Sequence, residues 1–107
     1  MDELNYIEIN IRDIGNEINM IIDVKGLFVI TNHFKKNITK DKINDLLRII
    51  RTWEEFYDYS YQLDPEKYLI RLISNNEEKT LKTNGIKPKN YNEFKMWVGE
   101  LYEWYKL

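Results

Sequence analysis

Apolar and polar residues alternate over the first part of the chain. In residues 4–11 isoleucine stands at every second position from Ile7 to Ile11, which is the period of a β-strand with one buried face. Residues 17–24 repeat this alternation. The glycine and asparagine in residues 13–16 accept the backbone angles of a tight turn. The pattern therefore predicts a hairpin of two strands.

Three further stretches have the composition of strands. Lys25 and Gly26 can close a second hairpin into residues 27–32, which are rich in β-branched and aromatic side chains. Residues 67–74 place large apolar side chains on one face, and a turn at two asparagines leads into residues 79–83. We expect these last two stretches to form another hairpin.

Helical periodicity replaces the alternation twice. Thr39 is a predicted N-cap, because its hydroxyl can accept from the unpaired amides of the next turn. A helix of about 20 residues is expected to follow it. Asn90 and Glu93 form a capping-box-like pair ahead of a second amphipathic helix near the end of the chain. The apolar stripe of the first helix consists of Ile43, Leu46, Leu47, Ile50, Trp53 and Tyr57.

The expected order of elements is βββ-α-ββ-α. Runs of strands separated by single helices predict an α+β fold, in which two amphipathic helices pack on one face of an antiparallel sheet. A chain of 107 residues with 43% hydrophobic residues fits one domain over residues 1–107.

Composition narrows the class of protein. The chain has no cysteine, which excludes disulfides and thiolate chemistry. Its acidic N-terminus lacks the apolar run of a signal peptide, and its longest apolar run, residues 27–30, is too short to cross a bilayer. We therefore expect a cytoplasmic protein that does not contact membranes. The chain also lacks alanine and is rich in Ile, Lys and Asn, a bias typical of AT-rich coding.

The net charge of −2 hides zones of opposite sign. Residues 1–24 carry six acids and one base, residues 25–51 carry seven bases and two acids, and residues 52–67 carry five acids and one base. Lysines at the start of the first expected helix and acids at its end oppose the helix dipole. Charges placed against the helix dipole can indicate that those residues serve a binding surface.

Two candidate binding surfaces follow from this zoning. The first joins acids to tyrosines, which offer large, rigid contact area, and suits a protein partner with a basic surface. The second is a basic patch, and it suits RNA or DNA less well because it has few aromatic residues for bases to stack on. The first surface comprises Glu54, Glu55, Asp58, Tyr59 and Tyr61, and the second comprises Lys35, Lys36, Lys40 and Lys42.

The residues that could carry catalysis do not form a motif. The lone His33 has no serine in a glycine-flanked turn, and the four glycines are too isolated for a phosphate loop. Glu77 and Lys79 match half of a magnesium-dependent nuclease signature, for which Asp64 is the candidate upstream carboxylate. We expect no metal, no cofactor and no enzymatic activity, with that nuclease as the minor alternative.

The chain resembles two kinds of known protein. Residues 84–94 look like a loop-into-helix pattern of small bacterial domains that carry no known activity. In size, cysteine-free α+β composition and lack of an active-site motif, the chain resembles phage and mobile-element inhibitors, anti-CRISPR proteins in particular, and toxin-neutralising immunity proteins. The resemblance is one of type, so no residue is carried over. It implies a larger protein partner, either a CRISPR effector nuclease or a toxin.

Overall fold

The computed structural model describes residues 3–13, 16–53, 56–57, 66–83 and 87–101. It contains seven strands and two helices in these ranges. In chain order they are β1 (Leu4–Asp13), β2 (Asn16–Asp23), β3 (Phe28–Thr31), β4 (Lys35–Asn37), α1 (Lys40–Ile50), β5 (Phe56–Tyr57), β6 (Lys67–Ser74), β7 (Glu78–Thr83) and α2 (Tyr91–Leu101).

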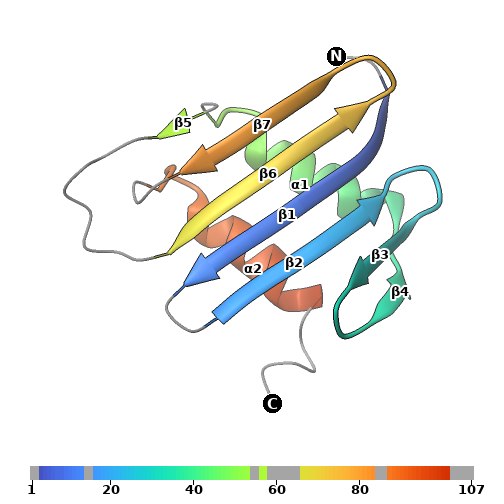
Figure 1. Ribbon diagram of the computed structural model, residues 1–107, viewed down its shortest axis with the longest axis horizontal. Coiled ribbons are helices and arrows are strands. Elements are labelled where there is room, and N and C mark those ends of the chain that lie inside the picture. Colours follow the sequence, from blue (N-terminus) through green and yellow to red (C-terminus); the bar gives the residue numbers. More distant parts are fainter. Residues whose placement is uncertain (1–2, 14–15, 54–55, 58–65, 84–86, 102–107) are drawn as a thin grey trace.

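The strands form one sheet in the order β4-β3-β2-β1-β6-β7-β5. All neighbours are antiparallel except β5, which runs parallel to the end of β7. Both helices lie behind the sheet when it is viewed face on, so they cover one face only (Figure 1). The predicted α+β class, with an antiparallel sheet and two helices on one face, is confirmed.

The alternation along β1 determines which face is buried. Ile7 and Ile9 are 0% and 2% exposed, and both point toward the helices. Their sheet partners are equally buried, because the register sets Ile9 opposite Met20 of β2 and Ile70 of β6. A strand places successive side chains on opposite faces, so this register assembles the apolar layer on which the helices pack.

The two helices supply the other half of the core. Thr39 caps α1 as predicted, since its side chain accepts a hydrogen bond from the amide of Lys42 at 3.1 Å. The indole nitrogen of Trp97 donates to the carbonyl oxygen of Lys42 at 2.8 Å and so ties α2 to the start of α1. The helical core residues are Ile43, Leu46, Ile49 and Ile50 of α1, and Tyr91, Phe94, Trp97, Val98 and Leu101 of α2.

The first helix is shorter than predicted. It ends at Ile50 after 11 residues, and Trp53 follows in a turn in which its amide donates to the Ile50 carbonyl. The Trp53 ring leaves the helical path to pack against Tyr68 and Phe94, with ring centres 5.0 Å and 5.2 Å away. Burial of this large aromatic residue outweighs the small gain of continuing the helix. The prediction that Tyr57 lies on the helix is also wrong, because it belongs to β5.

This earlier end changes the charge balance of the helix. The acids at positions 54, 55 and 58 come after α1, so the predicted helix charged against its dipole is wrong in that part. Within α1 Asp41 in the first turn and Arg48 in the last turn suit the helix dipole, whereas Lys40 and Lys42 in the first turn oppose it as predicted.

The capping pair predicted for α2 has other partners. The side chain of Asn90 accepts a hydrogen bond from the indole nitrogen of Trp53 and donates one to the carbonyl oxygen of Ile49 at 2.6 Å. Glu93 accepts from Arg48 at 2.8 Å. Both side chains therefore connect α2 to α1, and the capping-box prediction is wrong in this respect.

The turn between β2 and β3 is longer than the expected two residues. Asp23 pairs with Phe28, which leaves four residues in the loop. The positive φ of 58° falls on Leu27 and not on Gly26. Gly26 is needed for space, because a Cβ atom there would lie 2.6 Å from the Phe28 ring. Its amide donates to the Asp23 carboxylate at 2.7 Å, which closes the loop.

Candidate functional site

The four lysines of the predicted basic patch lie on two consecutive elements. Lys35 and Lys36 belong to β4, a strand that the sequence analysis missed, and Lys40 and Lys42 belong to the first turn of α1. The Lys36 ammonium donates to the carbonyl oxygen of Leu101 at 2.9 Å. It thereby supplies the cation that the last turn of α2 lacks.

Lys42 is also used inside the fold. Its ammonium pairs with Glu100 at 2.9 Å and lies 5.3 Å from the centre of the Trp97 ring. Lys36 and Lys42 therefore hold the end of α2 in place. The patch offers fewer bases to a phosphate backbone than its sequence predicts, which weakens the case for nucleic-acid binding.

The acid and tyrosine residues of the first predicted surface are not part of the described structure. Glu54, Glu55, Asp58, Tyr59 and Tyr61 lie outside the described residues. Their role in binding a partner remains a prediction.

The second face of the sheet is the surface that the sequence analysis did not identify. No helix among the described residues covers it (Figure 1). Four large apolar side chains nevertheless point outward from it: Tyr6 and Ile21 are each 44% exposed, Ile30 is 40% exposed and Leu69 is 37% exposed. We call the outward side of β1, β2, β3, β4, β6 and β7 the open face.

Sheet register brings several of these side chains together. Ile21 of β2 stands directly opposite Ile30 of β3, and Tyr6 of β1 stands opposite Ile73 of β6. Residues opposite each other on neighbouring strands have Cβ atoms about 5 Å apart, so each pair forms a small apolar patch. Single exposed apolar residues are ordinary, whereas several on one uncovered face are typical of an interaction surface.

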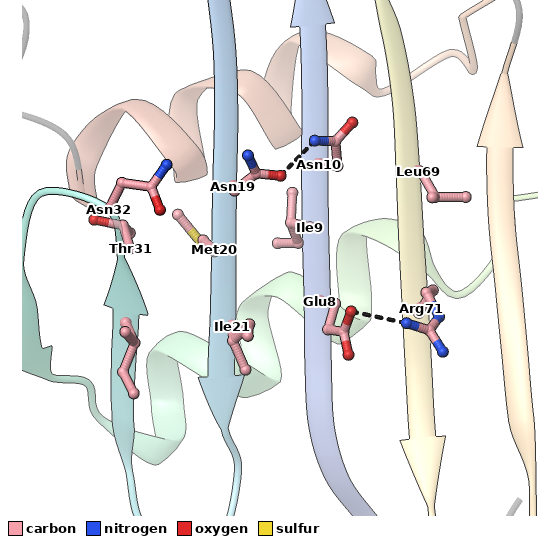
Figure 2. A pocket seen from close by; sticks show the side chains of 11 residues that line it. Glu8, Ile9, Asn10, Asn19, Met20, Ile21, Thr31, Asn32, Leu69 and Arg71 are labelled. Carbon is pink, nitrogen blue, oxygen red and sulfur yellow. Dashed lines mark hydrogen bonds and ion pairs between the residues drawn. The ribbon is translucent and has the colours of Figure 1, made fainter.

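A shallow hollow of about 230 Å³ lies between the patch of Ile21 and Ile30 and the side chain of Leu69. Figure 2 shows Ile21 on one side of it and Leu69 on the other, with Asn10 and Asn19 level with Leu69. Sites for drug-sized ligands usually have roughly 300–1,000 Å³. The hollow is therefore better suited to receive a side chain of a partner than to bury a small molecule.

A row of polar side chains crosses the upper part of the hollow. Asn10 donates one hydrogen bond to Asn19 (Figure 2) and another to Glu17, the latter at 2.9 Å. Hydrogen bonds from Asn10 and then Asn19 lower the pKa of Glu17 below its usual value, and the positive charge of Arg12 adds to this effect. The carboxylate is thus held in its charged form on the open face.

Arg71 lies between two carboxylates on the same face. Its guanidinium donates to Glu8 on one side at 2.9 Å (Figure 2) and to Glu78 on the other. The hydrogen bond to Glu78 and the charge of Glu8 raise the pKa of Arg71. These ion pairs hold Arg71 and its two carboxylate partners at defined places beside the exposed apolar side chains.

The sequence did contain a signal for the open face. A strand with one buried face alternates, but residues 20–22, 28–30 and 68–70 are each three consecutive apolar residues. The middle residues, Ile21, Val29 and Leu69, must point away from their two neighbours. Two of these middle residues are the exposed Ile21 and Leu69, whereas Val29 is buried and its neighbour Ile30 is exposed.

The candidate catalytic residues lie apart from this surface. His33 is in the turn between β3 and β4, where its amide donates to the Thr31 hydroxyl at 3.0 Å. Glu77 is in the turn between β6 and β7, and its amide donates to the Ser74 hydroxyl. Asp64 lies outside the described residues. Within the described ranges, no three His, Cys, Asp or Glu side chains are grouped so that they could hold a metal ion.

Comparison with known proteins found no match: neither a protein-family model nor a curated protein sequence is significantly similar to this chain. In the part of the chain that the structure describes, no helix has the length and apolarity to span a bilayer.

Proposed function

We propose that this protein is a non-enzymatic binding protein that acts by docking its open face onto a larger protein. The observation that carries the proposal is the group of Tyr6, Ile21, Ile30 and Leu69 on a sheet face that no described helix covers. Burying such side chains against a partner removes apolar surface from water, at roughly 25 cal/mol per Å².

The polar groups of the open face support the same proposal. Arg71 and Tyr6 are of the residue types enriched where interfaces derive most of their binding energy. The acids beside Arg71 already neutralise it, so the face has no excess positive charge at this point to attract a nucleic acid. A protein surface with apolar side chains and matching polar groups is the partner that such a face fits.

The most specific form of the proposal is an anti-CRISPR protein that blocks an RNA-guided nuclease. A cytoplasmic, stoichiometric inhibitor needs a docking surface and no active site, and it gains nothing from a cofactor. An immunity protein that neutralises a toxin would use the same kind of surface, and it is the alternative within this class.

RNA or DNA binding is the alternative from another class. It would use Lys35 and Lys40 together with Lys36 and Lys42, and the last two would have to release Leu101 and Glu100. A salt-sensitive shift of labelled single-stranded RNA, lost when all four lysines are changed to glutamate, would favour this alternative.

The proposal is tested with purified RNA-guided nucleases and purified toxins. The wild-type protein is mixed with each partner, and complex formation and inhibition of cleavage are measured. Replacing Ile21 with aspartate should weaken the complex about 10- to 100-fold, because a charge would be buried in the apolar patch. Met96→Asp is the matched control, since Met96 is 68% exposed on α2, away from the open face.

Two results would contradict the proposal. One is the absence of binding or inhibition at micromolar concentration for every RNA-guided nuclease and toxin tested. The other is a complex that Ile21→Asp and Met96→Asp weaken equally, because the partner would then not contact the open face. Circular dichroism of both variants is the control for correct folding.

A further inference from the structure

The acidic and basic side chains of the open face lie toward opposite ends of the strands. At one end Asp23 of β2 and Glu78 of β7 flank the pair of Tyr6 and Ile73. The register places all four side chains on the outward side, because Ile7 and Ile22 beside them are buried. This end of the face is therefore acidic.

The opposite end has the opposite sign. Among the residues that the structure describes there, it carries the bases Arg12, Lys67 and Lys82 and one acid, Glu17, which lies 3.7 Å from Arg12. Between the two ends, the cation of Arg71 is balanced by its contacts with neighbouring carboxylates. Lys35 of β4 lies toward the acidic end instead, where its ammonium is 4.5 Å from the centre of the Phe28 ring and offsets part of the negative charge, because Phe28 stands opposite Asp23.

This order of charges makes the open face complementary to itself. When two copies meet face to face, a two-fold axis in the interface that runs across the strands places the acidic end of each copy over the basic end of the other. An axis that runs along the strands would set like charges against each other. Closed dimers are built on such two-fold axes, in which the same patch of each copy is used twice.

We infer that the open face binds a second copy of this chain, in a two-fold dimer whose strands run in opposite directions across the interface. The inference deepens the proposed function, because the same face would be covered by the second copy until a target displaces it. It depends on that proposal only for the role of the dimer, and the dimer itself can be tested without any target.

Size and apolar content are sufficient for such an interface. The molecule measures 40 by 37 Å in the plane that Figure 1 shows and 20 Å across it. Stable complexes bury about 800 Å² per partner, and the open face leaves room for this. The patch of Ile21 and Ile30 and the side chain of Leu69 would be removed from water in both copies at once.

Two double variants test the charge order. The first, Lys67→Glu with Lys82→Glu, makes both ends of the face acidic. The second, Asp23→Asn with Glu78→Lys, makes both ends basic and keeps the side-chain oxygen that accepts from Gly26. Each variant alone should dimerise at least about tenfold more weakly than the wild type, whereas an equimolar mixture should recover the dimer as a heterodimer.

Sedimentation velocity over a range of concentrations measures these states. Met96→Asp is the control that should dimerise as the wild type does, because Met96 lies on α2. The inference is overturned by a wild type that stays monomeric at every concentration. It is also overturned if both double variants form homodimers as strong as that of the wild type, or if their mixture stays monomeric.

If a double variant does not fold, the salt dependence of wild-type dimerisation tests the same inference. The dissociation constant of the wild-type dimer should rise several-fold between 50 and 500 mM NaCl, because salt screens the opposed ends. A dimer insensitive to salt contradicts the inference. A monomeric protein that still binds a nuclease or a toxin through Ile21 would overturn the dimer and leave the proposed function standing.

Discussion

The side-chain oxygen of Asn90 accepts a hydrogen bond from the indole nitrogen of Trp53, across 37 residues of sequence. The same amide group donates to the carbonyl oxygen of Ile49, one residue before the end of α1. Asn90 thus satisfies a buried ring nitrogen and a helix-end carbonyl at once. It joins the end of α1 to the start of α2.

Replacing Asn90 with alanine should lower the free energy of unfolding by about 2–3 kcal/mol. Both Trp53 and the Ile49 carbonyl would lose a partner in a mostly buried place, and each unsatisfied group costs about 1 kcal/mol or more. Urea unfolding monitored by tryptophan fluorescence measures the change. Asn92→Ala, at an exposed position of α2, is the control and should change stability by less than about 0.5 kcal/mol. Equal effects of the two substitutions would contradict this role of Asn90.

Substitutions at two adjacent positions of the β2–β3 turn should have opposite effects on stability. Gly26→Ala should destabilise the protein by about 1 kcal/mol or more, because the added Cβ atom would collide with the Phe28 ring. Leu27→Gly should cost nothing or stabilise by up to about 1 kcal/mol, since glycine adopts the positive φ of 58° without strain. Thermal unfolding measures both, and a Leu27→Gly variant that is less stable than Gly26→Ala would show that the turn is built differently.

The pKa of Glu17 should depend on its hydrogen bonds with Asn10 and Asn19 on the open face. Its pKa in the folded protein is lowered, so its contribution to stability is present above the unfolded-state pKa near 4.5 and is lost as pH falls through the folded-state pKa. Asn10→Ala removes the largest cause and should raise the pKa of Glu17 toward its ordinary value. Carboxyl-detected NMR measures this titration. Asn44→Ala on α1 is the control, and an unchanged Glu17 titration in Asn10→Ala would contradict the assigned cause.

The lysines of the basic patch should separate into structural and surface residues. Lys36→Ala should destabilise the protein by about 1 kcal/mol, because the Leu101 carbonyl at the end of α2 loses its cation. Lys40→Ala should change stability little, since a cation at the start of α1 is mildly unfavourable. Chemical unfolding compares the two variants. If Lys40→Ala is the more damaging, Lys36 does not hold α2 as the contacts indicate.

The predicted surface of acids and tyrosines can be tested separately from the open face. If Glu54, Glu55 and Asp58 contact a basic partner, their joint replacement by lysine should slow association with that partner and invert its salt dependence. Tyr59→Ala and Tyr61→Ala should instead speed dissociation. Surface plasmon resonance separates the two rates. Unchanged rates in all these variants would remove this segment from the binding surface.

Local sequence was sufficient for most of the elements. The predicted hairpins and both helices are present, and β6 has the predicted bounds, because alternation and 3.6-residue periodicity depend on side chains close in sequence. β4 was missed because its three residues, Lys-Lys-Asn, carry no apolar pattern. It exists through pairing with β3, and that pairing is a tertiary contact.

The candidate site was less predictable than the fold. Charge counts along the chain identified the lysine patch, but not that Lys36 and Lys42 would be used to hold α2. The four exposed apolar side chains of the open face come from β1, β2, β3 and β6, and Tyr6 and Leu69 among them are 63 residues apart. Consecutive apolar residues in three strands indicated that both sides of these strands are apolar. They could not indicate which side the helices would leave uncovered.

The sequence by itself determined the α+β class, the buried face of the central strands and the N-cap of α1. Each of these depends on the spacing of residue types within a few positions. Only the tertiary structure decided the end of α1, the pairing of β4 and β5, the partners of Asn90, and the exposure of Ile21 beside Ile30. The physical reason is that these features arise where distant segments compete for the same contacts, and their packing energy exceeds the local preferences of the chain.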